Sequence, residues 1–280
     1  MTIKNTVPAQ LITSQVKLAL QEDIGQQDLT AELIPINSQA TATLITREPA
    51  TLCGKDWFNE VFLQLDPSIT IDWNFTDGDR LSAESIICTL TGSARTLLTG
   101  ERIAMNYIQT LSATATLVQL YTDQIRDLPV QILDTRKTIP GFRLAQKYAV
   151  RCGGGYNHRV GLFDGILIKE NHISATGSID AAVNKAQQLY PNIAIEVEVE
   201  TLNELEQALS AQADIILLDN FDIPTLKQAV KINKGQAKLE ASGGITIESI
   251  RPIAKTGIDR ISIGALTKDI RAIDLSMRFS

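Results

Sequence analysis

The chain contains 280 residues, of which 44% are hydrophobic, and its formal net charge is −6 at pH 7. This length suits one large or two small domains with a substantial core, and the spread of charge argues against nucleic acid as the main partner. No apolar run approaches the roughly 18 residues of a membrane span, and residues 1–5 lack the apolar core of a secretory signal, so we expect a cytoplasmic protein with no membrane partner.

The first part of the sequence predicts an α+β domain of the open-sandwich type, with an antiparallel sheet, at residues 1–113. A helix is expected near residues 8–21. Segments that alternate apolar and polar residues predict strands at 40–47, 68–73 and 85–90, with a turn at Asp77-Gly78-Asp79. A long helical stretch from Leu97 to about Ile125, expected to break near Ser112, leads into the rest of the chain.

The second half alternates short apolar runs with helix-like stretches, which is the order that a parallel α/β sheet requires. The runs predicted to form strands are residues 130–134, 165–169, 193–199, 214–219, 237–242 and 258–264. The helices predicted between them include residues 179–189, 202–211, 224–232 and 247–254. Because a full barrel has eight strands, we expect an incomplete, phosphate-binding α/β barrel at residues 114–267.

The end of the chain has the pattern of one more strand. Its apolar residues Ile273, Leu275, Met277 and Phe279 alternate strictly with polar ones, which is the period of a half-buried strand. We predict that this strand, within residues 268–280, returns to the sheet of the first domain and completes it.

The predicted strands of the second half end in, or are followed by, polar or small residues. In a barrel the carboxyl ends of the strands gather on one face, where such barrels carry out their chemistry, so we expect these residues to lie together. They are Arg136, Lys137, Lys169, Glu198, Asp219, Ser242, Gly243, Gly244 and Gly264.

A basic segment stands out in this acidic chain. Between Arg136 and Lys169 the only acid is Asp164, whereas the cations are Arg136, Lys137, Arg143, Lys147, Arg151, Arg159 and Lys169. Arginine offers a planar fork to a carboxylate or phosphate and lysine offers a point charge, so the segment predicts a site for a small polyanion. An isolated Arg-Lys pair is more often a solvated loop, but here it follows a strand and precedes Pro140-Gly141, which restricts the backbone.

The triplet Gly153-Gly154-Gly155 is either a flexible linker or a place where the backbone approaches a ligand. The cations around it favour the ligand. His158 alone would more often be a packing histidine, but beside Arg159 it is more plausibly a donor to a carboxylate. Lys169 could extend to solvent, form a Schiff base or bind substrate as a cation. The sequence leaves open whether His172 has any role.

Strict alternation in Ile195-Glu196-Val197-Glu198-Val199 gives one apolar and one acidic face. In an exposed sheet the acidic face would be solvated, but in a barrel strand it points inward, where carboxylates need partners. We expect Lys137 and Lys169 to supply them. The sequence does not rank Glu196 against Glu198.

Asp219 closes an apolar strand and is predicted to bind a metal ion or a ribose hydroxyl, with a helix cap as the alternative. The glycines that follow the last two strands are either simple turns or a phosphate site, in which bare backbone N–H groups at a helix start bind the anion. Phosphate is favoured for Ser242, Gly243, Gly244 and Gly264. A Walker loop and a dinucleotide fingerprint are both missing.

The three cysteines, Cys53, Cys88 and Cys152, are scattered and have no Cys-x-x-Cys spacing. Neither a disulfide framework nor a zinc site is indicated. We expect all three to be buried thiols.

The residues from Asp134 to Ile173, beginning DTRKTIPGFR and continuing through RCGGGYNHR to ILIKENHI, closely resemble the quinolinate phosphoribosyltransferases. The similarity also includes Glu22-Asp23-Ile24-Gly25, Gly100-Glu101-Arg102, Leu217-Leu218-Asp219-Asn220 and Glu240-Ala241-Ser242-Gly243-Gly244, so it covers nearly the whole chain. The resemblance implies an incomplete barrel and transfer of phosphoribose from 5-phosphoribosyl-1-pyrophosphate to quinolinate. The products would be nicotinate mononucleotide, pyrophosphate and CO2, in NAD synthesis.

The resemblance also implies roles for single residues. Quinolinate would be bound by Arg102, Arg136, His158, Arg159 and Lys169, with Arg102 reaching across a homodimer interface into the partner's site. The phosphoribosyl donor would be bound by Lys137, Glu198, Asp219, Ser242, Gly243, Gly244 and Gly264. Chemistry would fall to Lys137, Lys169, Glu198 and Asp219, and Mg²⁺ would be held by Glu198 and Asp219, directly or through water.

Three other functions remain open at the level of sequence. A related barrel transferase that acts on nicotinate, or the molybdenum-associated paralogue, would need fewer carboxylate-binding cations than this chain has. A Schiff-base aldolase would use Lys169 as its nucleophile. A noncatalytic phosphate-binding protein would bind a ligand without turnover.

Overall fold

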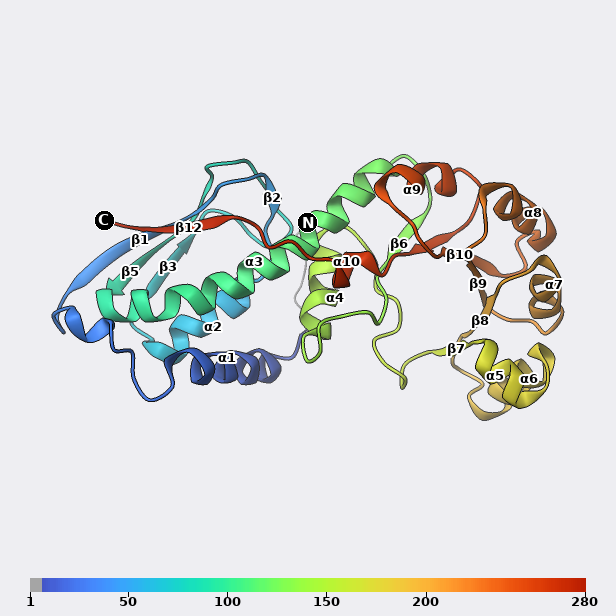
Figure 1. The fold of residues 1–280 in the computed structure, drawn as a ribbon, viewed down its shortest axis with the longest axis horizontal. Helices are drawn as coiled ribbons and strands as arrows, with labels where there is room; N and C mark the ends of the chain where they lie inside the picture. The colour runs from blue at the N-terminus through green and yellow to red at the C-terminus, as the bar shows by residue number, and fades with distance from the viewer. Residues whose placement is uncertain (1–6) are drawn as a thin grey trace. The chain divides into compact units, whose positions relative to one another are not determined.

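The computed structural model describes residues 7–280, which divide into two compact units (Figure 1). Unit 1 contains the chain up to Gln119, Leu144–Gly154 and Asp269–Ser280. Unit 2 contains Leu120–Arg143 and Gly155–Lys268. The segment Leu144–Gly154 lies inside the range predicted for the barrel but groups with unit 1.

Unit 1 is an α+β fold built on an antiparallel sheet with strand order β12-β1-β5-β3, and it has a small β2-β4 pair. Figure 1 shows α1, α2 and α3 beneath the strands. The strands are β1 (Gln39–Thr46), β2 (Ala50–Thr51), β3 (Thr70–Trp73), β4 (Arg80–Leu81), β5 (Ile86–Ser93) and β12 (Leu275–Phe279). The helices are α1 (Ala9–Ile24), η1 (Ala31–Leu33), α2 (Lys55–Leu65), α3 (Ala94–Gln124), which runs into unit 2, and α4 (Arg143–Cys152).

The C-terminal strand returns to the sheet of unit 1, which confirms the prediction. β12 pairs antiparallel with β1, from Ala42 opposite Phe279 to Thr46 opposite Leu275. The alternation in the sequence has its physical cause here, because Leu275 and Met277 are buried while Arg278 is exposed.

Helix α2 was not predicted, although it supplies much of the core of unit 1. Trp57, Phe58, Val61 and Phe62 are all buried, at the spacing of one helix face. The ring of Phe58 meets Trp73 edge to face, with the centroids 5.3 Å apart. The helix therefore packs its aromatic face against the sheet.

The break expected in α3 near Ser112 is wrong, since the helix runs without interruption from Ala94 to Gln124. Ser112 is 2% exposed, and its Oγ accepts the N–H of Cys53 at 3.0 Å and lies 3.1 Å from the carbonyl oxygen of Cys53. A serine that resembles a helix breaker in the sequence instead satisfies the backbone of a neighbouring loop.

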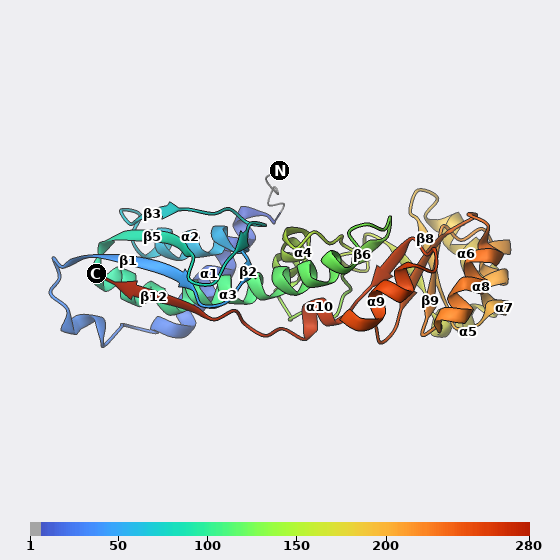
Figure 2. The same ribbon diagram turned by 90° about the horizontal axis from the view of Figure 1, so that it is seen from above.

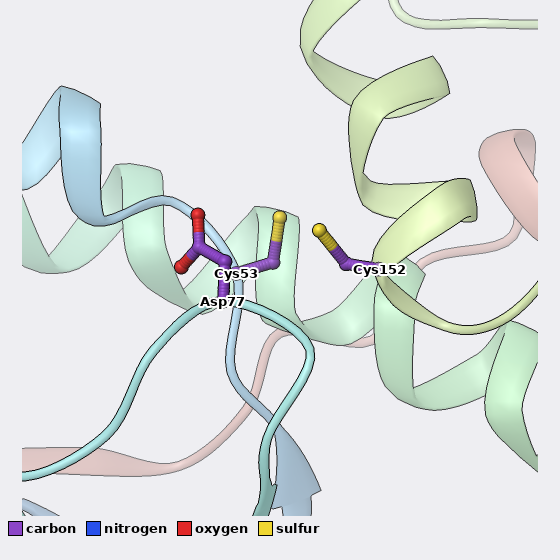
Figure 3. A group of neighbouring side chains, drawn as sticks. All are labelled: Cys53, Asp77 and Cys152. Carbon is purple, nitrogen blue, oxygen red and sulfur yellow. The ribbon is translucent and has the colours of Figure 1, made fainter. Parts of the chain in front are cut away.

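All three cysteines are free and buried, as predicted. In unit 1 the side chains of Cys53 and Cys152 point toward one another, beside Asp77 (Figure 3). The two sulfurs and a carboxylate oxygen of Asp77 lie within 4.8 Å of one another. However, Asp77 already accepts hydrogen bonds from the Tyr148 hydroxyl at 2.8 Å and from the Lys55 N–H at 3.3 Å. Because a structural zinc site needs four ligands, we interpret the cluster as packed thiols.

The thiols are expected to be unreactive in the folded protein. Burial raises the pKa of Cys53 well above its usual range and that of Cys88 to about 12, which leaves little thiolate at neutral pH. A colorimetric disulfide reagent should find no rapidly reacting thiol in the native protein and all three after denaturation. Rapid native reaction of even one equivalent would contradict the burial described here.

Unit 2 is built on a parallel six-stranded sheet with the order β6-β11-β10-β9-β8-β7. The strands are β6 (Gln131–Leu133), β7 (Ile166–Ile168), β8 (Ile195–Val199), β9 (Ile215–Asp219), β10 (Lys238–Ser242) and β11 (Arg260–Ser262). The helices are α5 (Glu170–Thr176), α6 (Ile179–Leu189), α7 (Leu202–Ser210), α8 (Ile223–Asn233), α9 (Ile247–Ala254) and α10 (Ala265–Lys268). Both views show α6, α7 and α8 on the same side of β8 and β9 (Figures 1 and 2).

The six predicted strands and the count below eight are confirmed. The first strand, β6, pairs with the last, β11, as it would in a barrel, but it does not pair with β7. Its other edge forms a parallel bridge from Leu133 to Tyr156. The residues just before His158 therefore cover the strand edge that a closed barrel would pair.

Polar N-caps determine where the barrel helices start. The side chains of Ser178, Thr201, Asp222 and Thr246 accept the N–H of the third residue of α6, α7, α8 and α9 respectively. Helices α7, α8 and α9 thus begin a few residues after β8, β9 and β10 end, whereas α6 follows α5, and the strand ends remain free to carry side chains. No helix within residues 7–280 is long and apolar enough to span a bilayer.

Candidate active site

A pocket of about 280 Å³ in unit 2 contains most of the site residues predicted from the sequence. It is lined by Thr135, Arg136, Lys137, His158, Arg159, Leu167, Lys169, Glu198, Leu217, Asp219, Ser242 and Ser262. The lining residues at or just beyond the carboxyl ends of the six strands are Thr135, Arg136, Lys137, Lys169, Glu198, Asp219, Ser242 and Ser262. His158 and Arg159 come from the loop before β7, and Leu167 and Leu217 lie within β7 and β9. Six of the nine residues expected to gather on one face therefore line this pocket, whereas Gly243, Gly244 and Gly264 do not.

The loop after β6 is held by hydrogen bonds to its backbone, which leaves its cationic side chains available. The Arg143 guanidinium donates to the Thr138 Oγ1 at 3.1 Å, the Val160 carbonyl at 3.0 Å and the Arg136 carbonyl at 3.4 Å. The Thr267 hydroxyl donates to the Lys137 carbonyl at 2.7 Å. The Nε of Arg136 is buried and has no hydrogen-bond partner within residues 7–280. Such a donor suits an incoming anion.

Asp134, which was not predicted as a site residue, positions the residues around His158. Its carboxylate is fully buried and accepts the Asn157 side-chain amide at 2.7 Å and the His158 N–H at 2.9 Å. These contacts follow directly from the bridge that brings Tyr156 beside β6. The buried charge is thereby satisfied, and the start of the basic loop is fixed.

A turn at residues 159–165 holds Arg159 in place. Its Nη1 donates to the Gly165 carbonyl at 3.2 Å, and the Asp164 carboxylate closes the turn by accepting the N–H groups of Val160 and Gly161, each at 2.8 Å. Burial and the nearby charge of Arg136 lower the pKa of Arg159. The two guanidinium groups are thus held close enough to repel one another, which a bound dianion would relieve.

Lys169 and Glu198 form the central ion pair of the pocket. The Lys169 Nζ lies 2.6 Å from the Glu198 Oε2, and the glutamate side chain is 13% exposed. The pair joins the end of β7 to β8. Since the lysine side chain is 43% exposed, it remains accessible to a ligand while it is held in place.

Glu196 faces inward as predicted, but its partner is neither Lys137 nor Lys169. Its Oε2 lies 2.9 Å from the His158 Nε2, which in turn lies 3.5 Å from the Glu240 Oε1. The Arg260 Nε lies 3.1 Å from the Glu240 Oε2. Glu196 is 4% and Glu240 0% exposed, so this cluster forms a buried layer beneath the pocket. The sequence-based prediction did not identify His158 as the partner of Glu196.

This layer changes two pKa values. Burial, and then the charge of Glu196, raise the pKa of Glu240 to about 7. Burial on its own lowers the pKa of His158, but the hydrogen bond and charge of Glu196 and the charge of Glu240 together raise it. Glu240 therefore carries less than its full charge near neutral pH, which reduces its repulsion of an anionic ligand.

Glu240 is expected to make stability fall as the pH rises. A carboxyl whose pKa is higher in the folded state than in the unfolded state, here about 7 against 4.5, stabilises the fold at low pH and loses that contribution as the pH rises through about 7. Relative to Glu240→Gln, the wild-type free energy of unfolding should fall by about 3 kcal/mol between pH 4.5 and 8. Urea titrations of both proteins across this range would measure the difference, and a constant difference would refute the shift.

The Asp219 carboxylate is held by the residue after it. Asn220 Nδ2 donates to the Asp219 Oδ2 at 2.9 Å, and the Asn220 N–H donates to the Ser242 carbonyl at 2.9 Å. Gly243 makes this possible, because at its φ of +100° a Cβ would lie 2.1 Å from the Asn220 Oδ1. A side chain at this position would displace Asn220 and with it the carboxylate.

Of the other two glycines predicted to bind phosphate, Gly244 is exposed and Gly264 is half-buried. Gly244 has a φ of +57°, and a Cβ built on it would have no neighbour within 4 Å. Gly264 lies so close to Lys137 that a Cβ would approach the lysine Cδ to 2.8 Å. Neither glycine lines the pocket directly, and their phosphate-binding role stays a prediction.

The carboxylates of Glu198 and Asp219 are suitable ligands for Mg²⁺. They stand at the carboxyl ends of the neighbouring strands β8 and β9, both are half-buried, and both line the pocket. Oxygen ligands of one or two carboxylates, completed by water and substrate phosphates, are what Mg²⁺ prefers. Lys169 occupies one oxygen of Glu198 and leaves the other available.

Arg102 and His172 also lie outside the pocket lining. Arg102 belongs to unit 1, where its side chain is exposed on α3. The Nδ1 of His172 accepts the Lys169 N–H at 3.0 Å. His172 therefore acts at the start of α5, directly beside the active-site lysine, by holding its backbone.

Glu240, Ser262 and Asp134 are the pocket and support residues that sequence reasoning missed. A signal existed for Glu240, because a carboxylate between Leu239 and Ala241 in an apolar strand follows the same alternation as Glu196. For Ser262 the signal was its place near the end of a predicted strand. The only signal for Asp134 was its position at the end of the strand predicted at residues 130–134.

Comparisons with known proteins agree along the whole chain. The family models of the N-terminal and C-terminal domains of quinolinate phosphoribosyl transferase match residues 28–112 and 114–278. A probable nicotinate-nucleotide pyrophosphorylase (carboxylating) from Bacillus subtilis is 43% identical over 257 residues, covering 91% of this chain and 89% of the relative.

Solved structures are equally similar. The nicotinate-nucleotide pyrophosphorylase from Francisella tularensis has a TM-score of 0.97 and 51% identity, covering 100% of this chain and 99% of that one. NadC from Streptococcus pyogenes has a TM-score of 0.95 and 37% identity, with 99% of each chain covered. The chain therefore belongs to the quinolinate phosphoribosyl transferase family.

Proposed function

We propose that this protein transfers phosphoribose from 5-phosphoribosyl-1-pyrophosphate to quinolinate with decarboxylation, giving nicotinate mononucleotide, pyrophosphate and CO2 for NAD synthesis. One observation carries the proposal above all. Arg136, Arg159 and Lys169 converge on a single pocket whose lining also holds the carboxylates of Glu198 and Asp219. A dicarboxylate and a phosphoribosyl donor together need this combination of charges.

The cations suit the quinolinate side of the reaction. Quinolinate has two adjacent carboxylates, and the Arg136 fork with its buried Nε and the Arg159 fork each fit one carboxylate in the bidentate manner. Lys169 adds a third positive charge beside them. Nicotinate, with a single carboxylate, would leave part of this charge unpaired, which favours quinolinate.

The carboxylates suit the phosphoribosyl side. As the bond from the anomeric carbon to pyrophosphate breaks, positive charge develops on the sugar, and Glu198 and Asp219 can stabilise it or bind the ribose hydroxyls. When bound, Mg²⁺ would offset the charge of the leaving pyrophosphate, and Lys137 is placed to assist. We assign the 5-phosphate to Ser242 and to the backbone of Gly243, Gly244 and Gly264.

The chemistry balances without a protein electron sink. The ring nitrogen of quinolinate forms a bond to the anomeric carbon as pyrophosphate leaves with the bonding electrons. The pyridinium that results stabilises the carbanion left when the neighbouring carboxylate departs as CO2, and a proton then takes its place. The residues of the pocket have only to bind, orient and exclude water.

A Schiff-base reaction at Lys169 is disfavoured by its surroundings. Its Nζ makes a 2.6 Å ion pair with Glu198, so the lysine is held as an ammonium group, which has no lone pair with which to attack a carbonyl. Borohydride treatment with carbonyl substrates should therefore trap no adduct.

We also propose that the enzyme acts as a homodimer in which Arg102 completes the partner's site. The proposal rests on the exposure of Arg102 and on its match to the family. Arg102→Ala and Lys169→Ala should each be inactive alone. Mixed and reassembled, they should recover about a quarter of wild-type activity, because half of the dimers would carry one intact site. No recovery from a mixture shown to contain mixed dimers would contradict shared sites.

The three free buried cysteines are typical of a reducing compartment, which supports our proposal of the cytoplasm. The activity itself is tested by incubating the protein with Mg²⁺, 5-phosphoribosyl-1-pyrophosphate and either quinolinate or nicotinate. Nucleotide should form from quinolinate and depend on a divalent cation, so that chelation stops it. Formation from nicotinate alone would transfer the proposal to the related nicotinate enzymes.

A further inference from the structure

His158 lines the pocket, yet both nitrogens of its ring are already engaged by the protein. The Nδ1 accepts the backbone N–H of Arg159 at 2.8 Å. The Nε2 lies 2.9 Å from the Glu196 Oε2. A ring nitrogen that accepts an N–H carries no proton, so in this geometry the N–H of the neutral imidazole is at Nε2 and is directed at Glu196.

The surroundings of Glu196 hold this arrangement in place. The side chains of His158 and Glu196 are 10% and 5% exposed. The second carboxylate of the cluster, Glu240, forms a further ion pair with Arg260, and its side chain is 0% exposed. A buried carboxylate flanked by a second one is costly to keep, so a cluster of this kind in a small pocket calls for a function.

Glu196 also acts on Arg159 through its charge. Arg136 and Arg159 repel one another, and among the charges near Arg159 that of Glu196 compensates for this repulsion, together with that of Asp164. Glu196 thus influences Arg159 in two ways. One is the hydrogen-bond chain through His158 to the Arg159 backbone, and the other is direct attraction of the guanidinium.

We propose that Glu196 is a positioning residue for quinolinate binding, which orients His158 as the Nε2–H tautomer and, through it, holds Arg159 in place for a substrate carboxylate. The inference rests on the proposed function for the identity of the substrate, while the tautomer and the contacts do not depend on it. Glu240 also faces the His158 Nε2, at 3.5 Å, and is itself paired with Arg260.

The kinetic test compares three variants. Glu196→Ala removes the acceptor and the charge and should raise the KM for quinolinate about tenfold or more, by loss of one charge-assisted hydrogen bond, while the KM for 5-phosphoribosyl-1-pyrophosphate stays within about twofold. Glu196→Gln keeps an oxygen that can accept from His158 and should recover part of the loss. Glu200→Ala, an exposed acid just beyond the same strand, should behave as wild type.

The spectroscopic test uses the fact that the chain has only two histidines. With ¹⁵N-labelled imidazoles, and His172→Asn to assign the signals, His158 of the wild type should appear as the Nε2–H tautomer at a pH above its raised pKa, where the ring is neutral. Its Nε2 proton should exchange slowly with solvent, and in Glu196→Ala it should exchange faster. This measurement needs no substrate, so it keeps the inference testable even where Glu196→Ala folds poorly.

Several outcomes would overturn the inference. They are an Nδ1–H tautomer of the neutral His158, an unchanged quinolinate KM in folded Glu196→Ala, or equal increases in both KM values, which would indicate a general structural role. Absence of quinolinate turnover by the wild type would instead refute the proposed function, and it would leave the histidine spectrum as it stands.

Discussion

Replacing Lys169 by alanine is expected to lower kcat/KM for quinolinate by about a thousandfold, with little change in the midpoint of thermal unfolding. The substitution removes one of the four lysine and arginine side chains that line the pocket. It also leaves the Glu198 carboxylate, now without its 2.6 Å partner, facing a dianionic substrate. Because the lysine side chain is 43% exposed, the ion pair itself contributes little to the stability of the fold.

The control for this prediction lies at the amino ends of the strands of the same sheet, whereas Lys169 lies at the carboxyl ends. Lys238 begins β10 and forms an ion pair with Asp259 at 2.7 Å, with the lysine side chain 67% exposed. Lys238→Ala removes a similar surface pair at the amino ends of the strands and should leave kcat/KM within about twofold of wild type, since the pocket is unchanged. Equal losses in the two variants, or near-normal activity of Lys169→Ala, would show that Lys169 has no special role.

Replacing Arg136 by alanine should abolish measurable turnover and weaken quinolinate binding by about a hundredfold or more, since a bidentate contact to a carboxylate is lost. The same change should leave the protein as stable as before or slightly more stable. Its Nε is a buried donor with no partner within residues 7–280, and removing such a group relieves a desolvation cost.

The binding loss is measured by calorimetry with quinolinate, and the stability by thermal unfolding without ligand. Arg136→Lys keeps the charge but loses the fork, so it should recover only a small part of the affinity. Full recovery by lysine would mean that Arg136 acts as a point charge alone. A large fall in unfolding temperature in Arg136→Ala would mean that the residue serves the fold and not the site.

The barrel could be predicted in detail because its strands are short apolar runs closed by polar residues. In a parallel sheet covered by helices, each strand must be apolar, and each carboxyl end is where side chains can meet a ligand. Lys169, Glu198 and Asp219 therefore appeared in the sequence in the order in which they appear around the pocket. The N-caps that begin the helices add the same kind of local signal.

The parts that could not be predicted depend on contacts between distant segments. Ser112 suggested a helix break, because its role in satisfying the Cys53 backbone is invisible in the sequence. Here tertiary packing, rather than local propensity, decided the structure. Helix α2 is different, because its buried residues stand at the spacing of one helix face and the sequence-based prediction overlooked that signal.

The same limit explains the partners of Glu196. The sequence showed that this carboxylate points inward and that lysines stand on the same face. It could not show that the bridge from Leu133 to Tyr156 would place the His158 Nε2 2.9 Å from the Glu196 Oε2. As a result His158, and not a lysine, is the partner of Glu196. Charge pairing in a crowded site is decided by backbone geometry, and Coulomb attraction alone does not select between available cations.

The measurement that tests the function most directly is release of CO2 from quinolinate carrying an isotopic label in the 2-carboxylate. The purified protein, Mg²⁺ and 5-phosphoribosyl-1-pyrophosphate should release one labelled CO2 for each nucleotide and each pyrophosphate formed, and the nucleotide should retain no label. Nucleotide that keeps the label, or pyrophosphate released without CO2, would contradict the decarboxylating transfer on which this account depends.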